Sequence, residues 1–147
     1  MGPYGASTFS LEVFDGFVHV EVANFLRCEG LSCRSEVFEI VEGGVADRTH
    51  RRPGVSRWDP LVLTTATEAS VFLLEWRDRH MRGGFGERVR TSGNVALRGP
   101  DGCVLRRWHF LSAWPVAWSG PILDSMTSQI AVERLELHHD GLRVTDR

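Results

Sequence analysis

The chain contains no lysine, and all seventeen of its basic residues are arginine. Nineteen acidic residues bring the formal net charge to −2 at pH 7. This balance gives no electrostatic footprint for nucleic acid or for an anionic membrane surface. Arginine forms forked pairs with carboxylates, so a surface that relies on arginine alone suits protein interfaces.

Long apolar runs are also missing. No stretch approaches the roughly 20 apolar residues that a membrane-spanning helix needs. The N-terminus has no basic region followed by an apolar core, so we expect no signal peptide, no stable membrane anchoring and assembly in the cytoplasm. Three cysteines, Cys28, Cys33 and Cys103, are an odd number. We expect reduced, structural thiols.

No catalytic or metal-binding motif is legible. The GGFGE segment at 83–87 lacks the Lys-Ser/Thr of a P-loop, and no G-x-S-x-G elbow occurs. Zinc needs four ligands, whereas Cys28 and Cys33 have no second cysteine pair. His138 and His139 are adjacent, so on a strand they point to opposite faces. The sequence therefore predicts no enzyme, no catalytic residue, no cofactor and no metal.

The chain has 147 residues, 42% of them hydrophobic, which predicts a single domain over 1–147 with a real core. Residues 8–22 predict a β-hairpin with Asp15-Gly16 as its turn. That turn pairs Val13 with Val18, Leu11 with Val20, and Phe9 with Val22. It leaves Ser10 and Glu12 on a solvated face.

One helix is predicted from about Ala66 to Met81. Thr65 and Glu68 fit a capping box, and Gly83 fits a C-terminal cap. The apolar face of this helix holds Ala69, Phe72, Leu73, Trp76 and His80. Further strands are predicted at 25–42, 60–64 and 94–98, so the pattern is mainly β with one α-helix.

Two extended runs near the C-terminus flank a proline-bearing segment. The strands are predicted at Cys103–Leu111 and Gln129–His139. Between them, Pro115 cannot donate to a ladder, so we expect a loop held to the body by Trp114 and Trp118. The second strand carries Ile130 and Val132 on one face and Leu135 and Leu137 on the other. Either a bulge lies near Glu133, or a partner covers the second face.

Residues 43–58 form a connection that is long for a compact domain. Either it contacts other subunits, or it is a solvated loop with incidental arginines. The residues assigned to the inter-subunit interpretation are Gly43, Gly44, Arg48, His50, Arg51, Arg52, Pro53 and Gly54.

The order of these motifs resembles the inner tube proteins of contractile phage tails and bacterial contractile injection systems. The resemblance rests on the pattern F-x-x-AWP-x-x-W-x-GP-x-L followed by E-x-LEL-x-H-x-GL, and on GG followed by H-x-x-PG at residues 43–54. The second segment is similar to the family's strand-to-strand loop or extended hairpin, a region that contacts neighbouring subunits in that family. The residues to which it assigns structural roles are Trp76, Trp108, Phe110, Trp114, Pro115, Trp118, Gly120, Pro121, Leu135, Leu137 and His139.

The resemblance implies an antiparallel β-sandwich or barrel-like tail-tube fold. It also implies hexameric rings that stack into a tube whose lumen conducts cargo or DNA. The implied partners are further copies of the chain, a contractile sheath protein, and baseplate hub, spike and cap proteins. The segments 64–66 and 54–58 depart from the family pattern, so a tube initiator on the baseplate remains an alternative. A monomeric β-sandwich binding module is a more distant one.

Overall fold

The computed structural model describes residues 8–15, 18–22, 25–41, 49–67, 72–82 and 90–145. Within them the chain forms ten strands and one helix. In chain order these are β1 (Thr8–Asp15), β2 (Val18–Val22), β3 (Arg27–Glu29), β4 (Cys33–Val41), β5 (Thr49–Trp58), β6 (Leu61–Ala66), α1 (Phe72–Arg82), β7 (Thr91–Arg98), β8 (Val104–Ser119), β9 (Val132–His138) and β10 (Gly141–Thr145).

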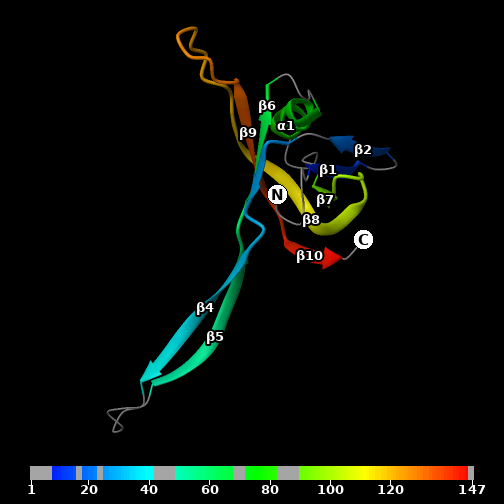
Figure 1. The fold of residues 1–147 in the computed structure, drawn as a ribbon. Helices are drawn as coiled ribbons and strands as arrows, with labels where there is room; N and C mark the ends of the chain where they lie inside the picture. The colour runs from blue at the N-terminus through cyan, green and yellow to red at the C-terminus, as the bar shows by residue number, and fades with distance from the viewer. Residues whose placement is uncertain are drawn as a thin grey trace.

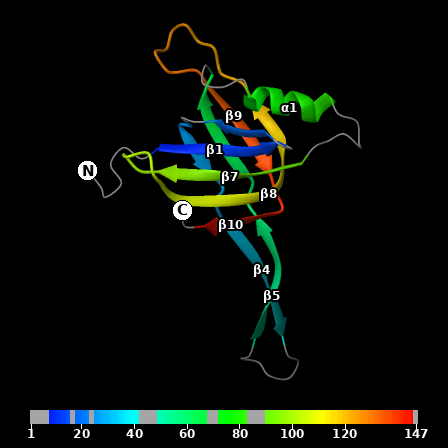
Figure 2. The same ribbon diagram turned by 90° about the vertical axis from the view of Figure 1, so that its right-hand side faces the viewer.

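The body of the molecule is a sandwich of two antiparallel sheets that share β8. The first layer has the order β2-β1-β7-β8-β10, and the second has the order β8-β9-β6-β3. Figure 2 shows β1, β7, β8 and β10 side by side, with β6 and β9 crossing them steeply. The strand β8 changes layer near Ser112, whose φ of 50° is a bend. The prediction of a mainly β sandwich-like fold with one helix is confirmed.

The core lies between the two layers. Alternate residues of each strand point inward, as in β6, where every second residue is buried. Trp76 closes the core from α1, at the end of the sandwich where β8 ends (Figure 2). Among the described residues, the largest fully buried side chains are Leu11, Val13, Leu61, Leu63, Phe110, Leu135 and Leu137.

The prediction of a loop around Pro115 is wrong, because β8 continues through it to Ser119. From Trp114 onward, β8 pairs with β9 on one side and with no other described strand. A proline is tolerated at such an edge, and the register shifts between Pro115 and Ala117. The strand therefore continues through the proline with a shifted register.

The predicted second strand is shorter than expected. It begins at Val132, and Ile130 lies outside it with 71% of its surface exposed. Pairing of β9 with β6 runs without a shift from Leu137 opposite Leu61 to Val132 opposite Ala66. Neither a bulge at Glu133 nor a covering partner is needed, because Leu135 and Leu137 simply face the core.

The predicted N-terminal hairpin forms, but its register differs by two residues. Val13 pairs with Val20, Leu11 pairs with Val22, and Asp15 is itself paired with Val18. A shift of two keeps every side chain on the same face, so alternation alone cannot detect it. Gly16 lies outside the described residues.

The outward face of β1 is not solvated as predicted. Ser10 and Glu12 are both buried. One carboxylate oxygen of Glu12 lies 3.4 Å from Arg98 and 3.6 Å from Arg107. Asn94 donates to the other oxygen at 3.3 Å, and its own carbonyl oxygen lies 2.7 Å from Nδ1 of His109. Side chains from β7 and β8 therefore cover the carboxylate of Glu12. The alternation of residues along β1 could not predict this burial, because the covering residues are far away in the sequence.

The helix exists, but its predicted start is wrong. Thr65 and Ala66 are the last residues of β6 and pair with β9. The helix begins at Phe72, and its buried face includes Trp76 and His80 as predicted. Glu68, Ala69 and Gly83 lie outside the described residues. Thr65 does not cap the helix, because it pairs with β9 as part of β6.

Candidate functional site

A long hairpin projects from the sandwich. It consists of β4 and β5, and Figure 1 shows it extending well beyond the body, beneath β3 and β6. Of the solvated loop and the extended hairpin expected for residues 43–58, the structure has the extended hairpin over Thr49–Trp58. Pro53 fits there because β5 pairs with β4 alone among the described strands, close to a register shift between Ser35 and Val37. Gly43, Gly44 and Arg48 lie outside the described residues.

The hairpin exposes large apolar side chains. Val37, Phe38, Ile40 and Val55 are each 44–63% exposed. A two-stranded ribbon is marginally stable in water unless something packs against it. A projecting ribbon with this composition is suited to contact with another surface.

The two faces of the hairpin differ in charge pairing. On one face Phe38 lies opposite Arg52 and Ile40 lies opposite His50. On the other face Arg51 forms an ion pair with Glu39 at 3.5 Å. Arg57 pairs with Glu36 at 3.3 Å. Arg52 has no ion-pair partner in the part of the chain that the structure describes, so its guanidinium can serve another surface.

Gly54 supports the ring of Phe38. A Cβ built on Gly54 would lie 2.8 Å from a ring carbon of Phe38 and 3.1 Å from the carbonyl oxygen of Glu36. The missing side chain therefore lets the Phe38 ring lie against the backbone of β5. Of the predicted inter-subunit residues, His50, Arg51, Arg52, Pro53 and Gly54 are brought together on this strand.

The base of the hairpin is held by a polar cluster. Ser32 donates a short hydrogen bond from its hydroxyl to the carboxylate of Asp59, and the backbone N–H of Asp59 donates to the carbonyl of Ser32 at 3.1 Å. Nε2 of His139 lies 3.0 Å from the carbonyl oxygen of Asp59, so this nitrogen is the donor. The ring of Trp58 packs against the same imidazole. This cluster joins the hairpin to the turn between β9 and β10.

Burial lowers the pKa of His139 below its ordinary value near 6.5, and the hydrogen bonds to Asp59 and Gly141 only partly offset this. The folded state therefore favours the neutral imidazole, while the unfolded chain takes up a proton near pH 6.5. The stability that His139 contributes is present above that pH and is lost as the pH falls below it.

We expect this one group to change the free energy of unfolding by at most about 1.4 kcal/mol per pH unit below pH 6.5. Denaturant unfolding of the wild type and of His139→Gln between pH 5 and 8 measures the difference. Glutamine keeps a donor near Asp59 but cannot titrate. If the free energy of unfolding changed equally with pH in both proteins, His139 would not be the group responsible.

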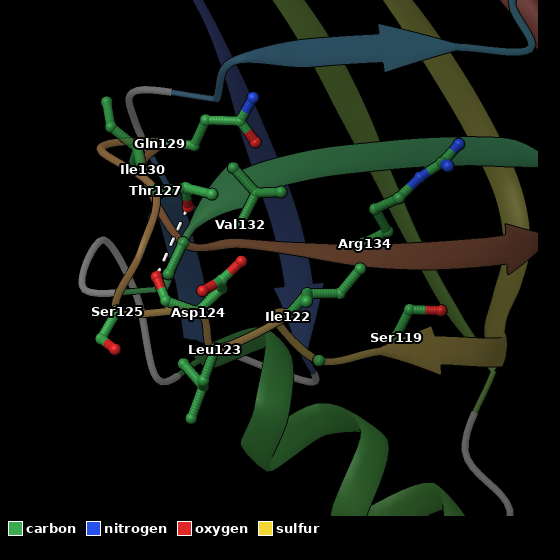
Figure 3. Close-up of a pocket in the computed structure, with 12 residues that line it drawn as sticks. Ser119, Ile122, Leu123, Asp124, Ser125, Thr127, Gln129, Ile130, Val132 and Arg134 are labelled. Carbon is green, nitrogen blue, oxygen red and sulfur yellow. Dashed lines mark hydrogen bonds between the residues drawn. The ribbon is translucent and has the colours of Figure 1, made fainter.

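A second projection rises from the opposite end of the body. It is the segment 120–131 between β8 and β9, which bounds an open pocket of about 990 Å³ (Figure 3). Ile122, Leu123, Met126 and Ile130 in it are each 71–92% exposed. Asp124 holds a turn, since its side chain accepts from the N–H of Met126 at 2.9 Å. A segment this apolar is suited to a partner surface.

The aromatic motif residues fix α1 against β8. Trp114 stacks on His80 with ring centroids 5.5 Å apart, and the ring of His138 packs against it at the same distance. The guanidinium of Arg77 lies 4.8 Å above the ring of Trp118. Phe110 and Trp76 are in the core, and Trp108 packs on it. Gly120 lies against the ring of Trp118, and Pro121 leads into the apolar segment.

Several strand edges remain without a partner among the described residues. In the first layer β2 pairs only with β1, and β10 pairs only with β8. In the second layer β3 pairs only with β6. Open edges offer unpaired backbone groups to another strand. Sequence patterns identified the strands but not which of them would lie at an edge.

No group of three or more His, Cys, Asp or Glu residues that could hold a metal occurs among the described residues. All three cysteines are free, and burial raises the pKa of the Cys28 thiol to about 11. No helix in the described ranges has the length and apolar character to cross a membrane.

Three solved structures illustrate what the fold is similar to. A chain of the anti-feeding prophage baseplate, solved by cryo-EM and 6-fold symmetrised, matches with a TM-score of 0.78 and 23% identity, covering 94% of this chain and 92% of that one. A chain of the sheath–tube complex of an extracellular contractile injection system, in the extended state, matches with a TM-score of 0.79 and 19% identity, covering 99% and 93%. A chain of the tube-terminating cap of the anti-feeding prophage matches with a TM-score of 0.74 and 19% identity, covering 93% and 88%.

No curated protein sequence matches the chain significantly. The family model described as T4-like virus tail tube protein gp19 matches residues 6–143, nearly the whole length. The predicted resemblance to inner tube proteins is thereby confirmed, and the chain belongs to the family of T4-like virus tail tube proteins.

Proposed function

We propose that the chain is a single-domain structural subunit that assembles into hexameric rings, and that these rings stack into a hollow tube. The observation that carries the proposal is the β4–β5 hairpin. Its strands pair only with each other in the described part of the chain, yet it exposes four large apolar side chains. Such a ribbon gains stability when another subunit covers it.

Within a ring, the open edges of the first layer support closure. β2 and β10 lie at opposite edges of one sheet, so β2 of one subunit can pair with β10 of the next. This is a head-to-tail contact, and head-to-tail contacts close into rings when the rotation permits. The joined first layers would then form one continuous wall around the lumen.

The partners we propose follow from membership in the family. They are a contractile sheath around the tube, a baseplate hub with its spike at one end, and a cap at the other, with cargo or DNA in the lumen. Similar folds occur in a sheath–tube complex, a baseplate and a tube-terminating cap, which supports these partners. We propose a mechanical role that needs no catalysis and no cofactor, and a final location in a phage tail or tail-like particle after assembly in the cytoplasm.

Size-exclusion chromatography with light scattering, followed by negative-stain electron microscopy, tests the function. The subunit has a mass of 16.5 kDa, so a ring has about six times that mass. The proposal expects rings and stacked rings. Rings that never stack would favour the alternative, a tube initiator on the baseplate. A monodisperse monomer at all concentrations would favour a β-sandwich binding module and contradict the proposal.

A further inference from the structure

One face of the first layer points away from the core. On β1, Leu11 and Val13 are buried in the core, so Ser10 and Glu12 point to the opposite side. In Figure 1 the first layer lies to one side of β6 and β9, so the second layer covers only its inner face. If first layers form the wall of the proposed ring, this outward face borders the lumen.

A row of polar residues crosses the outward face from strand to strand. Glu12 lies opposite Asn94, which in turn lies opposite His109 on β8. His109 lies opposite Arg143 on β10. Residues directly opposite one another on paired strands share a face, so Arg143 is on the same side as Glu12. The register also places a second glutamate, Glu21 of β2, opposite Glu12.

The carboxylate of Glu12 is shared by two arginines of this face. One of its oxygens lies 3.4 Å from Arg98 and 3.6 Å from Arg107, and the Glu12 side chain is only 8% exposed. The two arginine side chains are 25% and 31% exposed, so each still reaches the surface. Two cations against one buried carboxylate leave this cluster with excess positive charge.

Arg143 adds a third cation at the edge of the same face. Its side chain is exposed, and it forms no ion pair in the part of the chain that the structure describes. The described side chains of the outward face therefore include three arginines and one glutamate. The charge is graded across the layer, because the arginines belong to β7, β8 and β10 while Glu12 lies on β1, next to β2.

We propose that this arginine-bearing face binds the carboxylates of an acidic protein cargo inside the lumen. The assignment rests on the proposed tube and names the chemical class of what the tube carries. A guanidinium group matches a carboxylate with two parallel hydrogen bonds, which makes the contact directional. The face recurs in every subunit, so contacts that are weak alone add together along one cargo molecule.

The grading of charge favours an acidic protein over a nucleic acid. A nucleic acid strand carries one phosphate charge about every 3.4 Å, so a strand that crosses the face would meet Glu12 as well as the arginines. An acidic protein carries its carboxylates in patches and can place them against the arginines alone. A nucleic acid that threads a tube would also be held by arginine in every ring, which opposes its release.

Fluorescence anisotropy measures binding to the face whether or not the protein assembles. The probes are a fluorescein-labelled glutamate-rich peptide, a lysine-rich peptide, and a single-stranded oligodeoxynucleotide with the net charge of the first peptide. The glutamate-rich peptide is expected to bind, and to bind more weakly as salt is added. Its affinity is expected to exceed that of each other probe by at least about tenfold.

A charge reversal at an exposed position tests which residues bind the peptide. Arg143→Glu is expected to lower the affinity for the glutamate-rich peptide by at least about tenfold. Arg82→Glu makes the same change of charge at an exposed residue of α1, outside the first layer, and is expected to bind like the wild type. Melting temperatures of both variants show that each is folded.

Assembled tubes test whether the site faces the lumen. An antibody that quenches fluorescein is expected to reach the bound peptide on unassembled protein and to be excluded from peptide bound inside a tube. Negative-stain electron microscopy of the same samples shows whether tubes are present. Equal quenching in both samples would place the face on the outside of the tube and overturn the proposed site.

The outcomes separate this inference from the proposed function. Wild-type protein that forms neither rings nor tubes contradicts the proposed function itself. Tubes that do not bind the glutamate-rich peptide, or equal affinities of the wild type and Arg143→Glu, overturn the proposed site alone. Tighter binding of the oligodeoxynucleotide overturns the assignment to an acidic protein and indicates a nucleic acid cargo instead. Selective binding that Arg143→Glu weakens and Arg82→Glu does not supports the proposal.

Discussion

Gly30→Ala is expected to lower the free energy of unfolding by about 3 kcal/mol or more, combining a strained backbone with an overpacked site. Gly30 has a φ of +93°, and a Cβ built there would lie 1.9 Å from the carbonyl oxygen of Pro60. The obstruction is backbone, so it cannot rotate away. Relief would require the β3–β4 side to separate from the β5–β6 side at the hairpin base.

A matched control separates the two causes. Gly102 has a φ of +82°, but a Cβ there meets nothing within 4 Å. Gly102→Ala should therefore cost only the conformational strain, about 1 kcal/mol. Thermal and denaturant unfolding of both variants measures the difference. Equal losses of stability would mean that contact with Pro60 is not what requires glycine at position 30.

Removing the outer part of the hairpin is expected to abolish tubes while leaving the subunit folded. Because Phe38 pairs with Arg52, residues 39–51 can be replaced by Asn-Gly, a two-residue turn suited to closing a hairpin. None of the described residues in the deleted range belongs to the core cluster, so the sandwich should keep its stability. Circular dichroism and the melting temperature report the fold, and electron microscopy reports assembly.

The control keeps the length of the hairpin. The exchange of Glu39 and Arg51 preserves both strands and their ion pair, and should assemble normally. Normal stacked tubes from the shortened protein would show that the hairpin makes no contact between subunits. Loss of the melting transition would instead show that the sandwich needs the outer hairpin in order to fold, which also contradicts the expected result.

Local patterns predicted much of the sandwich. The N-terminal hairpin, the helix and the strands that carry Phe110 and Leu137 all follow from alternation or from helical spacing, because each signal lies within one short segment. The register of β1 on β2 did not follow, since a shift of two residues preserves both faces. The start of the helix could not be predicted from local patterns either, because Thr65 belongs to β6 and pairs with β9.

The candidate surfaces were harder to predict, because they depend on residues far apart in the chain. Glu12 is buried by Arg98, 86 residues away. The hairpin base depends on Gly30 meeting Pro60 and on His139 meeting Asp59. The sequence of β5 did not indicate a strand, because its arginines, proline and glycine are typical of a loop. Its pairing with β4, whose alternation was visible, is what makes it a strand.

A cryo-EM reconstruction of the purified, assembled protein tests the proposed rings and tube most directly. Stacked six-membered rings are expected, in which β2 of one subunit pairs with β10 of its neighbour. Each β4–β5 hairpin is expected to contact another subunit. A particle that remains a single copy, or an assembly in which the hairpin and both edges of the first layer stay solvated, would contradict the proposal.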